Sequence, residues 1–229
     1  MAQSVLVVAT HPDDECLGCG GTMARHSSKG DSVHVLIVAE GVTARSSFIT
    51  SAESENELFV LRSAAENAAN AVGAQPPEFL SLPDNRLDSI AMLDIVKKIE
   101  EVVKRTCPDI VYTHHGGDLN IDHRIVHQAV LTACRPLPGS KIRKILAFEI
   151  LSSTEWATPG ADAFRPNHFV DVSAHWKAKL AALRVYESEM RPFPHSRSLE
   201  AVEALSKFRG ASAGMPCAEA FMILRSIEQ

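Results

Sequence analysis

The stretch that most constrains how this chain can fold is residues 4–21, SVLVVATHPDDECLGCGG, in which an apolar run ends at His11 and acidic residues follow. Residues 5–9 are all apolar and include three valines. A continuous apolar run of this kind predicts a strand buried on both faces, as in a parallel sheet covered by helices. Ligands of such sheets bind at the carboxyl ends of the strands, so we expect the polar residues that begin at His11 to lie in a ligand site.

Three polar side chains of this stretch favour metal chemistry. If a helix begins after residue 12, His11 and Asp14 can face one point while Asp13 faces elsewhere. An imidazole and a carboxylate are ordinary zinc ligands, and a catalytic zinc keeps three protein ligands, so one more is expected from a distant segment. Asp13 would then be able to accept a proton from water at the metal. Two other interpretations stay open: a magnesium or phosphorylation pocket of another doubly wound fold, and acids that only complement a helix dipole.

The composition is that of a globular protein. With 229 residues, 45% of them hydrophobic, and a net charge of −5, we expect one domain, residues 1–229, that does not bind nucleic acid. No apolar run approaches the roughly 20 residues that span a bilayer, and no signal peptide precedes the first strand. We therefore expect a cytoplasmic protein, and we expect it to form a homo-oligomer. The five cysteines do not indicate a disulfide framework, and the glycines around Cys16 and Cys19 favour close packing of the first helix over a redox or zinc pair.

Strands and helices alternate along the rest of the chain, which predicts an α/β fold with right-handed crossovers. After the first strand, strands are predicted at residues 32–39, 78–82, 110–113, 144–150, 169–172 and 218–227. Helices are predicted at residues 14–28, 55–72, 90–104, 124–134, 173–186 and 198–208. Residues 40–54, which include Arg45, are predicted to form a loop at the carboxyl edge of the sheet, where loops commonly shape substrate access, and residues 209–214 a second loop.

A second polar cluster follows the strand at residues 110–113. It is HHGGDLNIDH, residues 114–123, and it leads directly into a predicted helix. Asp122 or Asn120 can cap that helix, which would place His123 in its first turn. If this strand neighbours the first one, His123 should converge with His11 and Asp14.

With both clusters in view, the chain resembles the zinc-dependent de-N-acetylases of the PIG-L/LmbE superfamily. The resemblance rests on residues 9–15, 20–21, 118–124, 209–210 and 219–221, in the order of that family. It implies a Rossmann-like three-layer αβα sandwich with one zinc ion held by His11, Asp14 and His123. It also implies that Asp13 is the general base and that the enzyme removes the N-acetyl group of an N-acetylglucosamine-type sugar or glycoconjugate.

The remaining expectations also depend on the resemblance. Asn120 stands where many relatives carry a histidine proposed to steady the oxyanion. An amide can still donate a hydrogen bond there, and His114, His115 or His127 are the alternatives for this role. Asp122 is expected to orient His123, with a helix cap as the alternative. Arg62 and Asp84 are similar to substrate contacts of the family, with a surface ion pair and a turn as alternatives.

Other functions and metals stay open. The chain could be a non-catalytic zinc or sugar-binding member of the fold, an amidase acting on a non-sugar N-acyl substrate, or a hydrolase with Cys16 or Cys19 as nucleophile. Other divalent ions also bind sites built from two histidines and an aspartate.

Overall fold

A seven-stranded sheet forms the centre of the computed structural model, which describes residues 2–41, 51–158, 160 and 162–228. Its strands lie in the order β3-β2-β1-β4-β5-β7-β6. The first five in that order are parallel, and β7 runs antiparallel to both of its neighbours. The strands are β1 Ser4–Ala9, β2 Ser32–Ala39, β3 Glu78–Leu82, β4 Ile110–His114, β5 Lys144–Phe148, β6 His168–Asp171 and β7 Ala218–Ser226. The predicted α/β class with a mostly parallel sheet is confirmed, whereas Arg45 of the predicted loop lies outside the described residues.

Strand β1 lies between β2 and β4, where the strand order reverses. Val5 pairs with Val33 of β2 on one side and with Ile110 of β4 on the other. In open parallel sheets, ligands bind in the crevice at such a reversal, beyond the carboxyl ends of the strands. His11 follows β1 and His114 ends β4, so both polar clusters of the sequence begin at this crevice.

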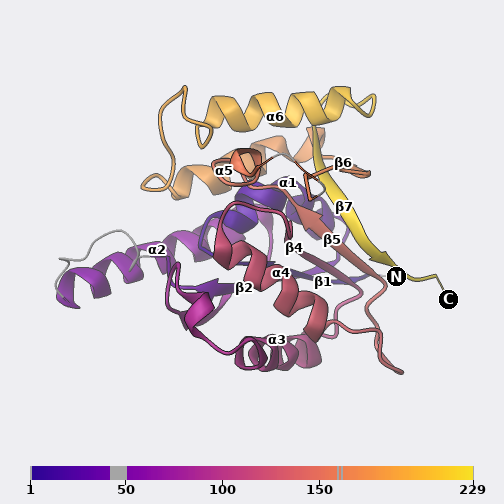
Figure 1. Ribbon diagram of the computed structural model, residues 1–229. Coiled ribbons are helices and arrows are strands. Elements are labelled where there is room, and N and C mark those ends of the chain that lie inside the picture. The colour runs from indigo at the N-terminus through magenta and orange to yellow at the C-terminus, as the bar shows by residue number, and fades with distance from the viewer. Residues whose placement is uncertain (1, 42–50, 159, 161, 229) are drawn as a thin grey trace.

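Helices cover both faces of the sheet and give the three predicted layers (Figure 1). Val5 and Val7 of β1 belong to the core beneath α1, α2 and α5, whereas Leu6 and Val8 belong to the core beneath α3 and α4. This alternation is what a strand buried on both faces requires. The helices are α1 Asp14–Ser28, α2 Ser51–Val72, α3 Met92–Thr106, α4 Ile121–Ala133, α5 Trp176–Val185 and α6 Leu199–Ala211, with 3₁₀ turns η1 Leu87–Ser89, η2 Thr154–Trp156 and η3 Ser173–His175. None of the described helices has both the length and the apolar character needed to cross a bilayer.

Helix α1 lies close to the sheet, as its small residues predict. A Cβ added at Gly18 would lie 2.5 Å from the ring of Phe148 in β5, so no larger residue fits there without displacing that ring. Cys16 and Cys19 are buried in the same helix, and both are free thiols. The predicted packing role of this glycine-rich segment is confirmed.

The sequence does not predict a break in the middle of α1. Cys19 has φ −148° and ψ 25°, so the helix consists of two segments that meet at this residue. The break exposes the amides of the second segment, and the carboxylate of Glu219 in β7 accepts hydrogen bonds from the N–H groups of Gly21 at 2.9 Å and Thr22 at 2.7 Å. Glu219 therefore caps the second segment from a strand almost 200 residues away in the sequence.

Lys179 of α5 completes this arrangement. Its Nζ donates to the carbonyl oxygen of Leu17, at the end of the first segment, at 2.9 Å and to Oε1 of Glu219 at 2.6 Å. Lys179 and Glu219 are only 2% and 4% exposed. Each charge is thus buried beside its opposite and also hydrogen-bonded to the helix ends that the break leaves open.

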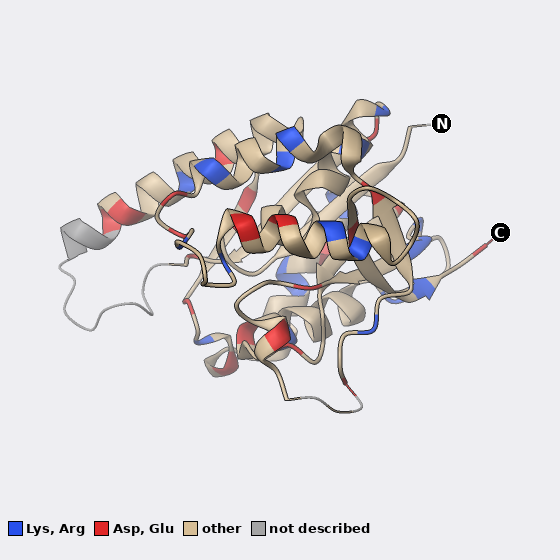
Figure 2. Cartoon of the chain, turned by 90° about the horizontal axis from the view of Figure 1, so that it is seen from above, with Lys and Arg blue, Asp and Glu red and all other residues tan. Residues whose placement is uncertain are grey.

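The predicted loop at residues 209–214 is wrong at its start, because α6 continues to Ala211. Position 210 of this helix requires glycine, because a Cβ there would lie 2.7 Å from the carbonyl oxygen of Met215 and 2.8 Å from the backbone nitrogen of Cys217. The glycine that suggested a loop instead allows the end of α6 to pack on the chain that enters β7. Figure 2 shows acidic residues in the first half of α6 and basic ones in the second, the distribution that a helix dipole favours.

Candidate metal centre

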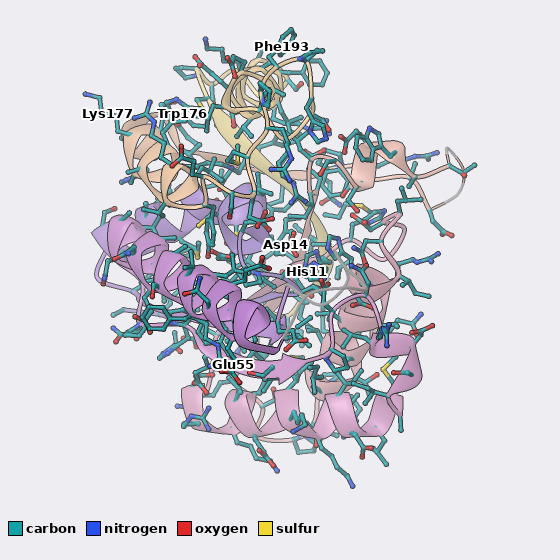
Figure 3. The ribbon with its side chains drawn as sticks, turned by 90° about the vertical axis from the view of Figure 1, so that its left-hand side faces the viewer. His11, Asp14, Glu55, Trp176, Lys177 and Phe193 are labelled. Atoms are coloured by element: carbon teal, nitrogen blue, oxygen red, sulfur yellow. The ribbon has the colours of Figure 1, made fainter. Side chains whose placement is uncertain are left out.

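His11 and Asp14 lie together where β1 turns into α1. The backbone N–H of His11 donates to Oδ2 of Asp14 at 2.9 Å, and Nδ1 of the imidazole lies 3.3 Å from the same oxygen. Figure 3 shows the two side chains close together near the centre of the molecule. Asp13 occupies the N-cap position of α1 with φ 115° and ψ −30°. Asp13 is not a member of the group of candidate metal ligands that contains His11 and Asp14.

His123 reaches the same point from the first turn of α4. Its Nε2 lies 3.2 Å from Oδ2 of Asp14, and its ring centroid lies 5.4 Å from that of His11. One ligand atom from each of these three residues lies within 4.8 Å of the other two. Helix α4 begins at Ile121, three residues earlier than predicted, because the side chain of Asn120 caps it by accepting a hydrogen bond from the N–H of Asp122 at 2.8 Å.

Several buried polar atoms around this point lack a hydrogen-bond partner among the described residues. They include Nδ1 of His114 and Oδ2 of Asp122. Buried polar atoms are nearly always hydrogen-bonded, so a group of exceptions at one place needs an explanation. Two imidazole nitrogens facing a carboxylate are the donor set of a divalent cation, and the residues present therefore fit zinc.

The electrostatics of the site also favour a cation. Burial by itself would lower the pKa of His11, but the carboxylates of Asp14 and Asp84 raise it to about 10. Burial would also raise the pKa of Asp14, yet the neighbouring imidazoles of His123 and His11 hold it well below its usual range. Both shifts arise because carboxylates are concentrated beside the imidazoles, and a bound metal ion would compensate the same negative charge.

Asp118 orients His123, a role that the sequence analysis gave to Asp122. Oδ1 of Asp118 lies 3.2 Å from Nδ1 of His123. Its carboxylate accepts hydrogen bonds from the hydroxyls of Ser153 and Thr154, the latter at 2.5 Å. Although burial would raise the pKa of Asp118, His123 and the two hydroxyls lower it to about 2, so the group is ionised. A carboxylate in this position fixes the orientation of a ligating imidazole and raises its basicity.

Asp122 lies beside His11 instead. Its Oδ2 is 3.9 Å from Nε2 of His11, and its Oδ1 accepts a hydrogen bond from the N–H of Leu87 at 3.1 Å. Asp84 is closer, with Oδ1 at 2.9 Å from Nε2 of His11. His11, Asp84 and Asp122 form a second group whose ligand atoms lie near one another.

His114 also belongs to the centre, whereas the sequence predicted it only as one of three histidines that could stabilise the oxyanion. Its Nε2 accepts a hydrogen bond from the N–H of Thr10 at 2.8 Å and lies 3.6 Å from Oδ2 of Asp14. Its ring stacks on that of His123, with 3.9 Å between centroids. Burial, with the nearby imidazole of His123, holds the pKa of His114 well below its ordinary value, so the ring is neutral. Its position at the end of β4 was the one signal that could have identified it.

Arg197 contacts the predicted general base. Its Nη1 donates to Oδ2 of Asp13 at 2.9 Å across 184 positions of sequence. Burial raises the pKa of Asp13 to about 8. Arg197 opposes this shift, whereas the negative charges of Asp14, Glu189 and Glu15 add to it. The strained backbone of Asp13 is also held in place, because its N–H donates to Oε2 of Glu15 at 3.1 Å. No motif of the sequence pointed to Arg197.

A comparison with protein families covers the segment that contains this arrangement. The PIG-L family model, described as GlcNAc-PI de-N-acetylase, matches residues 6–134, which include both polar clusters. The chain belongs to the PIG-L family. The predicted family is therefore confirmed, and so is the predicted enzyme class, because PIG-L relatives with the names of deacetylases match most of this chain.

Two curated relatives illustrate the range of the PIG-L family. An uncharacterised deacetylase of Escherichia coli, YaiS, is 29% identical over 192 residues, which are 81% of this chain and 91% of YaiS. A 4-oxalmesaconate hydratase of Pseudomonas putida is also 29% identical, over 195 residues that are 80% of this chain and 72% of that enzyme. Among solved structures, the N,N'-diacetylchitobiose deacetylase of Pyrococcus horikoshii has the same fold, with a TM-score of 0.79 at 21% identity over 98% of this chain and 84% of that one.

A cavity of about 140 Å³ opens beside the centre of this PIG-L protein. Asn120 lies in its wall, where the side-chain amide donates to Oδ1 of Asn85 at 3.3 Å. Arg62 does not line it, which differs from the predicted substrate contact: it is exposed on α2, and its Nη2 donates to the hydroxyl of Ser81 at 2.8 Å. The lining residues are His11, Pro12, Asp13, Gly41, Asp84, Asn85, Asn120, Glu189 and Arg197.

Proposed function

We propose that this protein is a zinc-dependent hydrolase that removes the N-acetyl group of an N-acetylglucosamine-type sugar or glycoconjugate, with residues 1–229 acting as a single domain. The observation that carries the proposal is the meeting of His11, Asp14 and His123 within 4.8 Å, with a buried imidazole nitrogen that has no hydrogen-bond partner among the described residues. The family description, GlcNAc-PI de-N-acetylase, supports an N-acetylglucosamine-type substrate.

In this proposal His11, Asp14 and His123 hold the zinc ion. When bound, zinc supplies a Lewis acid that acidifies water and polarises an amide carbonyl. In its ionised form, Asp13, which lies beside His11 in the wall of the cavity, accepts the proton of the attacking water and then passes it to the leaving amine.

The other polar residues of the cavity orient the substrate. Arg197 holds the Asp13 carboxylate in one position through its hydrogen bond of 2.9 Å. The amide of Asn120 faces the cavity and can donate a hydrogen bond to the oxygen that becomes negative during attack, which takes the role of the histidine found in many relatives. Asp84 offers a carboxylate to the hydroxyl groups of a sugar, but its short contact with His11 is equally compatible with orienting that ring.

The proposal is tested with purified protein stripped of metal and then reloaded with zinc. Acetate and free amine are measured by mass spectrometry after incubation with a panel of N-acetylated sugars. We expect Asp13→Asn to retain zinc and to lower turnover by about 10²–10⁴, the usual contribution of general acid–base catalysis. Asp31→Asn is a matched control that should leave turnover unchanged, because Asp31 precedes β2 at the amino ends of the parallel strands and the cavity lies at their carboxyl ends. Full activity in Asp13→Asn would overturn the role of this residue.

A hydratase is a second candidate, because the 4-oxalmesaconate hydratase has the same 29% identity to this chain as the uncharacterised deacetylase, although less of its own length is matched. Activated water can add to a polarised double bond as well as to an amide carbonyl. Consumption of 4-oxalmesaconate without any release of acetate from the sugar panel would favour this candidate. Zinc binding without either reaction would favour the non-catalytic alternative.

A cysteine nucleophile receives no support. Burial raises the pKa of the Cys16 and Cys19 thiols well above the usual range, so neither is a thiolate at neutral pH. An amidase acting on a non-sugar N-acyl substrate stays an alternative that the same panel can test. The homo-oligomeric state and the cytoplasmic location stay predictions.

A further inference from the structure

A second compartment, of about 270 Å³, adjoins the catalytic cavity. The two share Glu189 and Arg197 as lining residues. The catalytic cavity alone is smaller than the roughly 300 Å³ at which ligand pockets usually begin, but the two compartments together reach that range. The residues that line the second compartment are Ser152, Trp156, Glu189, Arg191, His195 and Arg197, all beyond the segment that the family model matches.

One wall of this compartment is a loop between α5 and α6 that is closed by its own hydrogen bonds. The N–H of Arg191 donates to the carbonyl oxygen of Arg197 at 3.1 Å, and the N–H of Arg197 donates to Nδ1 of His195 at 3.0 Å. Since Nδ1 of His195 accepts this bond, Nε2 carries the ring proton and can donate. Figure 3 shows Phe193, in the same loop, at the outer edge of the molecule, whereas His11 and Asp14 lie at its centre. The loop therefore extends from the surface to the catalytic cavity.

The opposite wall is the turn η2. The N–H groups of Ser152 and Ser153 donate to the carboxylate of Glu155 at 2.7 and 3.2 Å, which fixes the turn. The hydroxyl of Ser152 accepts a hydrogen bond from Nε of Arg197 at 3.0 Å and so connects the two walls. The turn ends in Trp156, whose side chain is 54% exposed and lines the compartment. An exposed indole at the wall of a polar compartment offers an apolar face on which a ring can pack.

The two arginines of this compartment differ in their partners. Arg197 is paired inside the protein, because its Nη1 donates to Oδ2 of Asp13 at 2.9 Å and lies 3.9 Å from the buried carboxylate of Glu189. Arg191 is exposed, and its Nη1 donates to the carbonyl oxygens of Ser188 at 2.6 Å and Met190 at 3.0 Å. These bonds orient the guanidinium group at the mouth of the compartment. An exposed guanidinium that is held in one orientation is suited to a carboxylate or a phosphate.

We propose that this compartment is a second substrate subsite, which binds the part of the molecule attached to the N-acetylglucosamine-type ring and selects for an acidic group on it. Arg191 binds the carboxylate or phosphate, and Trp156 packs against the apolar surface of the attached group. Arg197 lies between the two subsites and contacts Asp13. This inference rests on the proposed function, because it assumes that the acetamido group occupies the catalytic cavity.

The test compares three substrates with the zinc-loaded full chain: the methyl glycoside of N-acetylglucosamine, its carboxymethyl glycoside, and N-acetylglucosamine 1-phosphate. We expect kcat/KM for at least one acidic substrate to exceed that for the methyl glycoside by about tenfold, the effect of one charge-assisted hydrogen bond. The better of the two acidic substrates identifies the anion.

Variants assign this preference to the compartment. Arg191→Gln should remove it by raising KM for the acidic substrates about tenfold more than KM for the methyl glycoside, whereas Arg191→Lys should retain part of it. Arg184→Gln, which removes another exposed arginine of the same region, is the matched control and should behave as the wild type. Equal rates for all three substrates, or an equal loss for all three in Arg191→Gln, would overturn the subsite.

A binding measurement separates failure of the subsite from failure of the proposed function. The chain has two tryptophans, so Trp176→Phe leaves Trp156 as the single indole fluorophore. Titration of this variant with N-acetylglucosamine 1-phosphate or the carboxymethyl glycoside should change its fluorescence saturably, and Arg191→Gln should weaken that response. Such binding without acetate release would refute the proposed function and retain an anion site, whereas acetate release without the fluorescence response would refute the subsite alone.

Discussion

Two clusters of buried charged side chains lie on helix α1, and they differ in whether their polar atoms are satisfied. At the break in the middle of the helix, Glu219 accepts hydrogen bonds from Gly21, Thr22 and Lys179, and Lys179 also donates to the carbonyl oxygen of Leu17. At the start of the helix, the imidazoles around Asp14 include a buried nitrogen that has no hydrogen-bond partner among the described residues. The first cluster is complete within the protein, whereas the second has the polar groups of a cation site.

This difference distinguishes buried charges that stabilise the fold from buried charges that bind a ligand. An ion pair inside a protein is tolerated when every donor and acceptor is matched, as in the pair formed by Lys179 and Glu219. A carboxylate surrounded by partly unmatched imidazoles is costly in the absence of a ligand. The comparison therefore predicts that Lys179 and Glu219, at the break in α1, contribute to stability, whereas the cluster around Asp14 determines metal binding.

Removal of one partner of the complete pair should have the largest effect on stability. Lys179→Met leaves the carboxylate of Glu219 buried without its cation, and we expect the free energy of unfolding to fall by about 3–5 kcal/mol. Zinc content of the folded fraction should not change. Chemical denaturation and metal analysis measure the two quantities, and the double variant Lys179→Met with Glu219→Gln should recover part of the loss. A single variant as stable as the wild type would remove the structural role of the pair.

Addition of zinc should stabilise the protein by a smaller amount. Binding to the folded state alone contributes about 2.7 kcal/mol when free zinc is 100 times its dissociation constant. We expect the melting temperature of the metal-free protein to rise with zinc concentration, and His123→Ala to lose this rise. Thermal unfolding at several zinc concentrations measures the effect. An equal rise in His123→Ala would mean that the ion binds elsewhere.

Replacement of the residue that orients His123 should weaken zinc binding without abolishing it. Asp118→Asn retains the shape of the side chain but removes the charge 3.2 Å from Nδ1 of His123. Residues in this position typically change metal affinity by about 10–100-fold. Competition with a chelator measures the affinity, and Asp122→Asn is the informative comparison, because Asp122 lies beside His11. A larger loss in Asp122→Asn than in Asp118→Asn would reverse the assignment made from the structure.

The smallest effect on stability is expected at the cap of α4. Asn120→Ala removes the hydrogen bond to the N–H of Asp122, which should lower the free energy of unfolding by about 1 kcal/mol. If Asn120 also stabilises the oxyanion, turnover should fall by about 10²–10³. Asn120→Ser, which retains a cap, separates the two roles: it should restore stability without restoring turnover. Restored turnover in that variant would limit Asn120 to a structural role.

The sequence predicted the main chain arrangement closely because apolar runs and their ends carry most of that information. The strands at residues 32–39 and 78–82 have the predicted bounds. The two polar clusters were expected to meet because each follows a strand, and the pairing of β1 with β4 brings their carboxyl ends together. The positions of His11, Asp14 and His123 follow from this pairing, while their role as zinc ligands stays a prediction.

The contacts that the sequence did not predict depend on side-chain direction or on distant loops. Asp122 lies next to His123 in the chain, yet successive helical residues point in different directions, and Asp118 makes the contact. Arg62 was expected at the substrate but interacts with Ser81 and the ring of Phe79. Arg197 lies in a loop that has no periodic pattern, so nothing in the sequence connected it with Asp13.

The two-segment construction of α1 has a consequence for protein engineering. The segment that carries Asp14 ends after only a few residues, and the carbonyl oxygen of Leu17 near its end accepts a hydrogen bond from a lysine of α5. The loops after β5 and α5, which border the second compartment, can therefore be exchanged for those of other sequences if Lys179 and Glu219 are retained together with Ser153, Thr154 and Arg197, the loop residues that hold Asp118 and Asp13. Such chimeras should change which molecules are accepted while leaving the Asp14 carboxylate where it is.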